Sequence, residues 1–131
     1  MLTPYSSQAL AVLLQYFPDW STLVTQQEGT FQVAFTTPAG WNFWLGSDEE
    51  EQLTVGLAEF HTHFGGYSES SAEADAKEAA LFVQALQRQE LVLAVWYDGE
   101  QYLESAVLPA NEEPQVLRFG HNQRVQVKQW A

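Results

Sequence analysis

The sequence predicts an α+β domain, in which an antiparallel β-sheet of about seven strands carries two main α-helices. Two stretches of the chain repeat their apolar residues with the period of an amphipathic helix. The remaining chain contains short runs rich in β-branched and aromatic residues, separated by turns that contain glycine or proline. The order of one helix, a group of strands, a second helix and a second group of strands is typical of helices packed on an antiparallel sheet. A chain of 131 residues fits one domain, so we expect a single domain over residues 1–131.

The first helix is predicted to begin after Thr3, because threonine caps helices and Pro4 then takes the first helical position, which proline favours. Pro18 ends this helix. Its buried face is expected to carry apolar side chains spaced three and four residues apart. They are Ala9, Val12, Leu13, Tyr16 and Phe17.

The first group of strands is predicted to begin with Trp20–Gln26 and Thr30–Thr36, which the turn at Glu28-Gly29 joins. Trp41–Gly46 is the third strand. Apolar and polar residues alternate in Thr30–Thr36, so one face of this strand should be buried and the other exposed.

The next predicted strand, Gln52–Phe64, changes its buried face along its length. Its leading leucines and valine point to one side, whereas Phe60 and Phe64 fall on the other. A strand cannot change faces without an extra residue, so we expect a bulge or bend between Gly56 and Glu59.

The second helix is predicted to run from a capping box to about Arg88, with Ser70 at the cap and Glu73 reaching back to it. Its expected buried side chains are Leu81, Phe82, Ala85 and Leu86.

A hairpin is the clearest element of the second half. Val92–Tyr97 and Glu100–Leu108 flank Asp98-Gly99, a dipeptide that favours a two-residue type I′ turn. Gln115–His121 and Arg124–Trp130 are predicted to form a last pair of strands.

The charge of the chain is strongly one-sided. The net charge is −12, and the first 76 residues contain ten of the seventeen acids but no lysine or arginine. Such a field repels phosphates and acidic lipids and attracts basic proteins, so nucleic-acid binding is disfavoured. Residues 115–131 carry Arg118, Arg124 and Lys128 without an acid, and are therefore able to pair with the acidic half inside the fold.

Composition also bears on compartment and chemistry. The absence of cysteine excludes disulfides and thiolate metal sites and suits a reducing cytoplasm. The apolar stretch Ala9–Leu14 is too short to span a bilayer, and no positively charged secretion signal precedes it. We therefore expect a soluble cytoplasmic protein without membrane contact. The chain has no phosphate-binding loop, zinc-protease motif or nucleophile elbow, so we expect no enzymatic activity.

Four consecutive acids, Asp48, Glu49, Glu50 and Glu51, form the densest cluster of charge. One interpretation is a solvated loop between strands. The other is a docking site for a basic partner, because adjacent acids without basic neighbours repel one another at some cost in stability. A calcium loop fits poorly, because the alternate ligands and the glycine of such loops are missing.

Three residues of the segment 59–64 project to one side of a strand: Glu59, His61 and His63. The histidines are interpreted as structural hydrogen-bonding groups, as contacts for a partner, or as zinc ligands. In the last case Glu59 or His121 would be the third ligand.

The predicted hairpin displays Tyr97, Glu100, Tyr102 and Glu104 on one face, with Val92, Ala94, Trp96 and Leu103 on the core side. Tyrosine beside acid has the composition of a protein-binding patch, and also that of an ordinary half-exposed sheet face.

A small and very acidic α+β domain with a His-Thr-His-Phe strand, followed by a helix at Glu78–Arg88 that runs into Val-Trp-Tyr-Asp-Gly-Glu, resembles bacterial immunity proteins. These proteins neutralise the toxins of polymorphic-toxin and contact-dependent growth inhibition systems. The likeness covers roughly residues 59–105. It implies a cytoplasmic inhibitor that binds one toxin tightly, usually a nuclease with a basic substrate groove, and it carries over no catalytic residues.

We therefore expect an immunity protein, or antitoxin, that covers the basic active site of a cognate toxin domain and uses no cofactor. The expected contact residues are Asp48, Glu49, Glu50, Glu51, Glu59, His61, His63, Tyr97, Glu100 and Tyr102. Two alternatives stay open. One is a small zinc-binding protein or metal-dependent hydrolase that uses His61 and His63, and the other is an adaptor for a different basic protein.

Overall fold

The computed structural model describes residues 1–66, 70–114 and 123–131 and has the predicted α+β class. Its helices are α1 (Pro4–Tyr16), the short 3₁₀-helix η1 (Pro18–Thr22) and α2 (Ala72–Gln87). The strands before α2 are β1 (Val24–Gln27), β2 (Thr30–Thr36), β3 (Asn42–Ser47), β4 (Gln52–Leu57) and β5 (Phe60–Gly65). The strands after it are β6 (Leu91–Asp98), β7 (Gln101–Pro109) and β8 (Gln123–Lys128).

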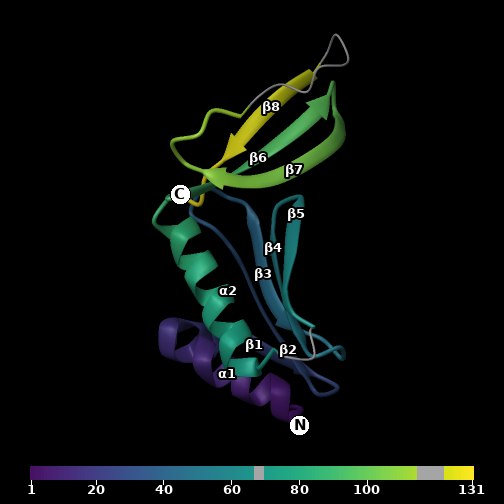
Figure 1. Ribbon diagram of the computed structural model, residues 1–131, viewed down its shortest axis with the longest axis vertical. Coiled ribbons are helices and arrows are strands. Elements are labelled where there is room, and N and C mark those ends of the chain that lie inside the picture. The colour runs from purple at the N-terminus through teal and green to yellow at the C-terminus, as the bar shows by residue number, and fades with distance from the viewer. Residues whose placement is uncertain (67–69, 115–122) are drawn as a thin grey trace.

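The strands of the described residues divide between two antiparallel sheets instead of forming one. The larger sheet has the order β1-β2-β3-β4-β5, and the smaller has the order β7-β6-β8. Both helices lie on one side of the five-stranded sheet, and the three-stranded sheet lies beyond one of its ends (Figure 1). No helix in the described part of the chain is long and apolar enough to cross a membrane.

The start of α1 is as predicted, because the hydroxyl of Thr3 accepts a hydrogen bond from the amide of Ser6 at 3.1 Å. The predicted strand at Trp20 is wrong. Trp20 lies in η1, which begins at Pro18, and its ring stacks on Phe17 with centroids 4.1 Å apart. The chain becomes extended only at Val24, where β1 starts.

The long strand predicted over residues 52–64 is a hairpin, and the predicted bulge is its two-residue turn. Leu57 pairs with Phe60, and Leu53 pairs with Phe64. Because cross-strand partners share a face, the phenylalanines lie on the same side as the leucines, not on the opposite side. Ala58 takes a positive φ of 51° in the turn, so the chain reverses without glycine or asparagine.

Helix α2 begins one residue later than predicted, with Ser71 as its cap: the Ser71 hydroxyl accepts from the amide of Ala74 at 3.1 Å. Its buried face also differs, because Leu81 is 49% exposed whereas small alanines face inward. This lets α2 pack closely against α1, β4 and β5. The buried residues of the helix are Ala72, Asp75, Ala76, Ala79, Ala80, Val83 and Leu86.

The second hairpin forms in a register other than the predicted one. Its two-residue loop is Gly99-Glu100, and Asp98 pairs with Gln101. A bulge after Trp96 shifts the pairing further, so that Trp96 opposes Glu104. The predicted core side is correct in part: Val92, Ala94 and Trp96 are buried, whereas Leu103 is 39% exposed. The opposite face of β6 is also buried and joins the main core cluster. That face carries Leu93, Val95 and Tyr97.

The C-terminal strand β8 pairs with β6, and Trp130 after it enters the main core, edge-on to Phe43 at 5.1 Å between ring centroids. The predicted partner strand Gln115–His121 lies outside the described residues. The C-terminus ends where the two sheets meet (Figure 1).

Candidate functional site

The helices leave one face of the five-stranded sheet uncovered (Figure 1). Two rows of residues cross the strands on this face. Cross-strand partners share a face, so the strand register defines both rows. The first row runs through Thr25, Gln32, Gly46, Thr54 and His63. The second row runs through Ala34, Trp44, Gly56 and His61.

Trp44 is a large aromatic side chain on this uncovered face of the sheet, which we call the open face. It is 36% exposed, and its indole lies against the backbone of its cross-strand partner Gly56. A Cβ at position 56 would collide with the indole, so glycine is required there for Trp44 to lie on the sheet. An exposed tryptophan held in place by its neighbours has the character of an anchor in protein interfaces.

A hollow opens beside Trp44, because the first row lacks a side chain at Gly46. The hollow has a volume of about 280 Å³ and is bordered by Trp44, Thr54 and Asp48 among others. A Cβ at Gly46 would lie 2.9 Å from the carbonyl oxygen of Phe31, so a larger residue there would force the neighbouring backbone to shift. The close approach of β2 and β3 therefore keeps this position free of a side chain.

The four consecutive acids form the turn between β3 and β4, next to the hollow. The carboxylate of Asp48 accepts hydrogen bonds from the amide of Glu50 and from Nε2 of Gln52, both at 2.8 Å. Asp48 is half-buried, whereas Glu49, Glu50 and Glu51 are exposed. The turn is therefore an ordered structure that fixes one carboxylate and leaves three in solvent.

A second hollow of about 200 Å³ adjoins the first and shares Asp48 with it. Glu28, in the turn between β1 and β2, and Glu49 border this second hollow. We call the five acids of these two turns the acidic end. They are Glu28, Asp48, Glu49, Glu50 and Glu51.

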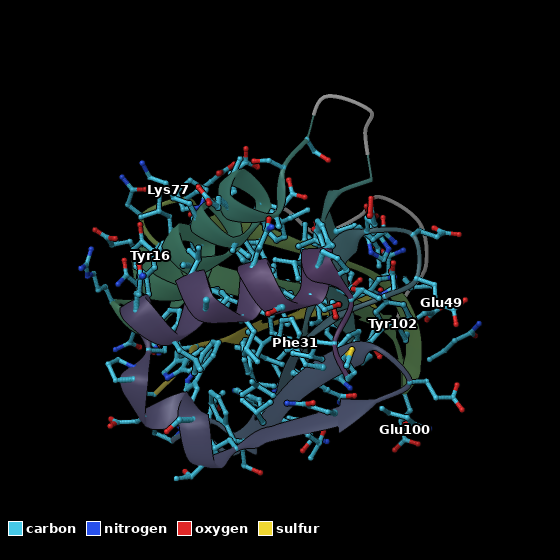
Figure 2. All side chains as sticks on the ribbon, turned by 90° about the horizontal axis from the view of Figure 1, so that it is seen from below. Tyr16, Phe31, Glu49, Lys77, Glu100 and Tyr102 are labelled. Atoms are coloured by element: carbon cyan, nitrogen blue, oxygen red, sulfur yellow. The ribbon has the colours of Figure 1, made fainter. Side chains whose placement is uncertain are left out.

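No cation of the described residues forms an ion pair with the acidic end, because the one ion pair among those residues joins Lys128 to Glu59. Lys77 lies on the opposite side of the molecule from Glu49 (Figure 2). The acidic end therefore keeps its negative field, which is the property expected of a docking site for a basic partner.

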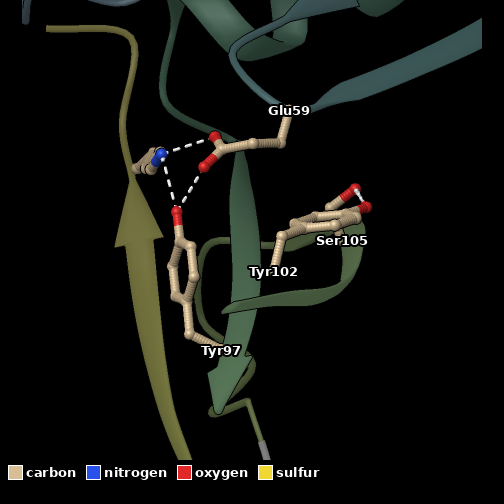
Figure 3. A network of polar contacts seen from close by, with 5 residues as sticks. Glu59, Tyr97, Tyr102 and Ser105 are labelled. Atoms are coloured by element: carbon tan, nitrogen blue, oxygen red, sulfur yellow. Dashed lines mark hydrogen bonds and ion pairs between the residues drawn. The ribbon is translucent and has the colours of Figure 1, made fainter. Parts of the chain in front are cut away.

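Glu59 does not belong to this site. It lies in the β4–β5 turn, at the end of the sheet away from the acidic end, and its carboxylate binds Nζ of Lys128 at 2.5 Å. The hydroxyl of Tyr97 donates a hydrogen bond to the same carboxylate and accepts one from Lys128 at 3.2 Å (Figure 3). This pair confirms that the basic C-terminal stretch neutralises part of the acidic half within the fold.

The pKa values of both partners follow from this network. Burial alone would raise the pKa of Glu59, but the hydrogen bonds from Lys128 and Tyr97 outweigh it and hold the pKa below its ordinary value of 4.5. Burial alone would lower the pKa of Lys128, whereas its bonds to Glu59 and Tyr97 raise the pKa above 10.5. Both residues are therefore charged at neutral pH, and their charges cancel.

The tyrosines and the acid of the second hairpin do not form the expected patch. Tyr97 is only 8% exposed, and the guanidinium of Arg124 lies 4.2 Å from its ring centroid. Tyr102 is 44% exposed and shares a hydrogen bond with Ser105 at 2.9 Å (Figure 3). Glu100 is exposed in the loop beyond β6, at the end of the molecule remote from the β3–β4 turn (Figure 1). Burial of Tyr97 removes it from the accessible surface.

The two histidines of β5 are exposed on the open face, and their ring centroids lie 5.5 Å apart. Nδ1 of His63 is hydrogen-bonded to Oγ1 of Thr54 at 2.7 Å, as the structural interpretation predicts. Within the described ranges, histidine, aspartate and glutamate side chains do not gather in groups of three that could hold a metal ion. Glu59 is engaged by Lys128, and His121 lies outside those ranges.

The structure thus brings together only part of the predicted set. Asp48, Glu49, Glu50 and Glu51 share one turn, and His63 is at one end of the row that passes this turn at Gly46 and Thr54. Sequence reasoning missed two residues that shape the surface, Trp44 and Gly46. A tryptophan and a glycine two positions apart within a predicted strand are the signal that could have indicated them, because glycine in a strand often marks a close approach.

Comparison with protein-family models, with characterised proteins and with solved structures gave no match for this chain. The resemblance to immunity proteins therefore stays a hypothesis that rests on residues 59–105.

Proposed function

We propose that this protein binds and neutralises a basic protein in the cytoplasm, as an immunity protein does with its cognate toxin. The observation that carries the proposal is the acidic end: its exposed carboxylates have no cationic partner in the described residues and adjoin an open sheet face with an exposed tryptophan. Charged groups of this kind steer a partner of opposite charge, and aromatic anchors slow its release.

The proposed contact surface is narrower than the one expected from the sequence. It comprises the acidic end and the open face around Trp44, with His63 at its far edge. Glu59 and Tyr97 are left out, because each is occupied by Lys128 inside the protein. Glu100 in the β6–β7 loop and Tyr102 in β7 belong to the other sheet's hairpin, and they would meet only a partner that also spans the molecule's long axis.

The mechanism of inhibition follows from charge. A nuclease toxin binds the phosphates of its substrate with lysine and arginine, and a cluster of carboxylates competes for the same cations. Because the protein's own net charge is −12, it would also repel a nucleic acid held in the toxin's substrate groove as the complex forms. The inhibitor therefore needs no catalytic group.

The proposal is tested by growth protection. The gene immediately upstream of this one is expressed in a bacterial host, alone and together with the protein. We expect the upstream product to stop growth, and the protein to restore growth and co-purify with that product. A host that grows equally well with the upstream product alone, or that is not rescued, would contradict the proposal.

Two charge variants sharpen this test. Glu49→Lys combined with Glu50→Lys reverses two charges at the acidic end, whereas Glu78→Lys combined with Glu90→Lys makes the same change at exposed sites outside it. We expect loss of protection only for the first pair. Zinc analysis of the purified protein serves as an independent check: one bound equivalent that is lost on His61→Ala would favour the metal-binding alternative.

A further inference from the structure

We propose that the hollow over Gly46 receives one arginine side chain of the partner. This inference rests on the proposed function, because it assigns the chemistry of one contact at the same surface. Three properties of the hollow support it: its shape, the fixed carboxylate at its edge and the nature of its walls.

The shape suits a long side chain. The floor is the backbone at Gly46, and the flanking residues in the cross-strand row are Gln32 and Thr54. The volume of about 280 Å³ is several times the roughly 30 Å³ that one water molecule occupies in the liquid. A side chain is therefore able to enter without moving the sheet.

The charge selects a cation. Asp48 borders the hollow, and two hydrogen bonds within the turn hold its carboxylate in one orientation. An ionised carboxylate offers about four lone-pair sites, so acceptor capacity remains for an incoming donor. Glu28 and Glu49 border the adjoining hollow and reinforce the negative field, which excludes an anionic or acidic occupant.

The walls favour arginine over lysine. The hollow is lined by Trp44 and by residues with neutral polar side chains such as Gln32 and Thr54. A guanidinium is planar, carries five donors and is weakly hydrated, so it can lie against an aromatic wall and still reach a carboxylate and neutral acceptors. An ammonium group is a strongly hydrated point charge, so removing its hydration water on entry to such a site costs more free energy.

The test uses a probe that needs no knowledge of the partner. The peptide acetyl-Gly-Arg-Gly-amide is titrated into the ¹⁵N-labelled protein, and the same peptide with citrulline in place of arginine serves as the neutral control of equal shape. We expect saturable NMR shifts centred on the Trp44 indole and the Gly46 amide, and at least about tenfold weaker binding of the citrulline peptide, as loss of one charge-assisted bond predicts. Equal binding of both peptides, or shifts centred elsewhere, would overturn the inference.

Two variants that each remove one negative charge distinguish a direct contact with Asp48 from the general electrostatic field of the acidic end. Asp48→Asn should weaken binding of the arginine peptide about tenfold, whereas Glu51→Gln, three residues away and outside the lining of the hollow, should change it less than twofold in 0.15 M salt. Gln32→Trp keeps every charge but places a large side chain beside its cross-strand partner Gly46, and should weaken binding of the arginine peptide at least tenfold. Similar losses for Asp48→Asn and Glu51→Gln, or full binding by Gln32→Trp, would contradict the assignment.

The outcomes also distinguish this inference from the proposed function. If the arginine peptide fails to bind in the hollow while the protein still protects cells from the upstream toxin, the arginine contact is wrong and the function stands. If the peptide binds the hollow but no toxin is neutralised, the site exists and the proposed function is wrong. Circular dichroism checks that each variant is folded. If Asp48→Asn does not fold, Gln32→Trp still tests the contact, because it leaves the residues of the β3–β4 turn unchanged.

Discussion

The ion pair between Glu59 and Lys128 makes an asymmetric prediction about stability. The side chain of Lys128 is 6% exposed and that of Glu59 is 31% exposed. Glu59→Gln would leave a nearly buried ammonium without a counter-ion, a change that typically costs about 3–5 kcal/mol. Because water reaches the carboxylate and screens the pair, we expect a loss of about 2 kcal/mol in the free energy of unfolding.

The reciprocal change should cost less. Lys128→Met keeps an apolar stem in the packed interior and leaves Glu59, which water reaches and Tyr97 still binds. We expect a loss of about 1 kcal/mol, and the double variant should resemble Lys128→Met alone, because methionine removes the stranded charge. Urea unfolding followed by tryptophan fluorescence at pH 7 measures all three variants.

The pH dependence gives a second readout of the same pair. The folded pKa of Glu59 is lowered, so its contribution is present above 4.5 and is lost as the pH falls through the folded pKa. The folded pKa of Lys128 is raised, so its contribution is present below 10.5 and is lost as the pH rises through the folded pKa. The deficit of Glu59→Gln should therefore shrink below pH 4.5. A deficit under 0.5 kcal/mol at pH 7, or one that does not change on acidification, would refute this reasoning.

Three further predictions concern the sheet and the helices. Gly56→Ala should displace the indole of Trp44, lower the free energy of unfolding by about 1–3 kcal/mol and change the fluorescence spectrum; an unchanged spectrum would contradict the packing. Tyr5→Phe removes the donor that binds the buried carboxylate of Asp75 at 2.7 Å, and should cost about 1–3 kcal/mol in urea unfolding. Burial and the bond to Asp75 raise the pKa of Tyr5, so wild-type stability should begin to fall above its ordinary value of 10.0, and this decline should be weaker in the variant. Leu81→Gln should change thermal stability by less than about 0.5 kcal/mol, because Leu81 is 49% exposed; a larger loss would mean that it is buried in solution.

The sequence predicted correctly those elements whose conformation depends on neighbouring residues in the chain. Thr3 and Pro4 begin α1, and Thr30–Thr36 is a strand with its expected buried face, because capping and alternation depend on neighbouring residues alone. The turn at Ala58 was missed because neither it nor Glu59 is a residue that favours positive φ. Without a turn signal, one hairpin was interpreted as one bent strand, and its phenylalanines were assigned to the wrong face.

Tertiary contacts account for the other differences. The bulge after Trp96 changes the hairpin register, and no local sequence pattern indicates this bulge. Tyr97 was expected at the surface, but Arg124 and Lys128 of β8 cover it, and Glu59 reaches it from the other sheet. The candidate site also combines local and tertiary features. The acidic turn was evident in the sequence, whereas the hollow over Gly46 depends on which strands lie beside β3.

The central claim, that the acidic end captures a basic partner, is tested most directly by association kinetics with the purified upstream toxin. The association rate constant is measured from 0.05 to 0.5 M salt for the wild type, for Glu49→Lys with Glu50→Lys, and for Glu78→Lys with Glu90→Lys. We predict that only the first pair slows association at low salt and flattens its salt dependence, because steering arises from charges near the contact. If that variant associates as fast as the wild type at low salt, the acidic end is not the docking site.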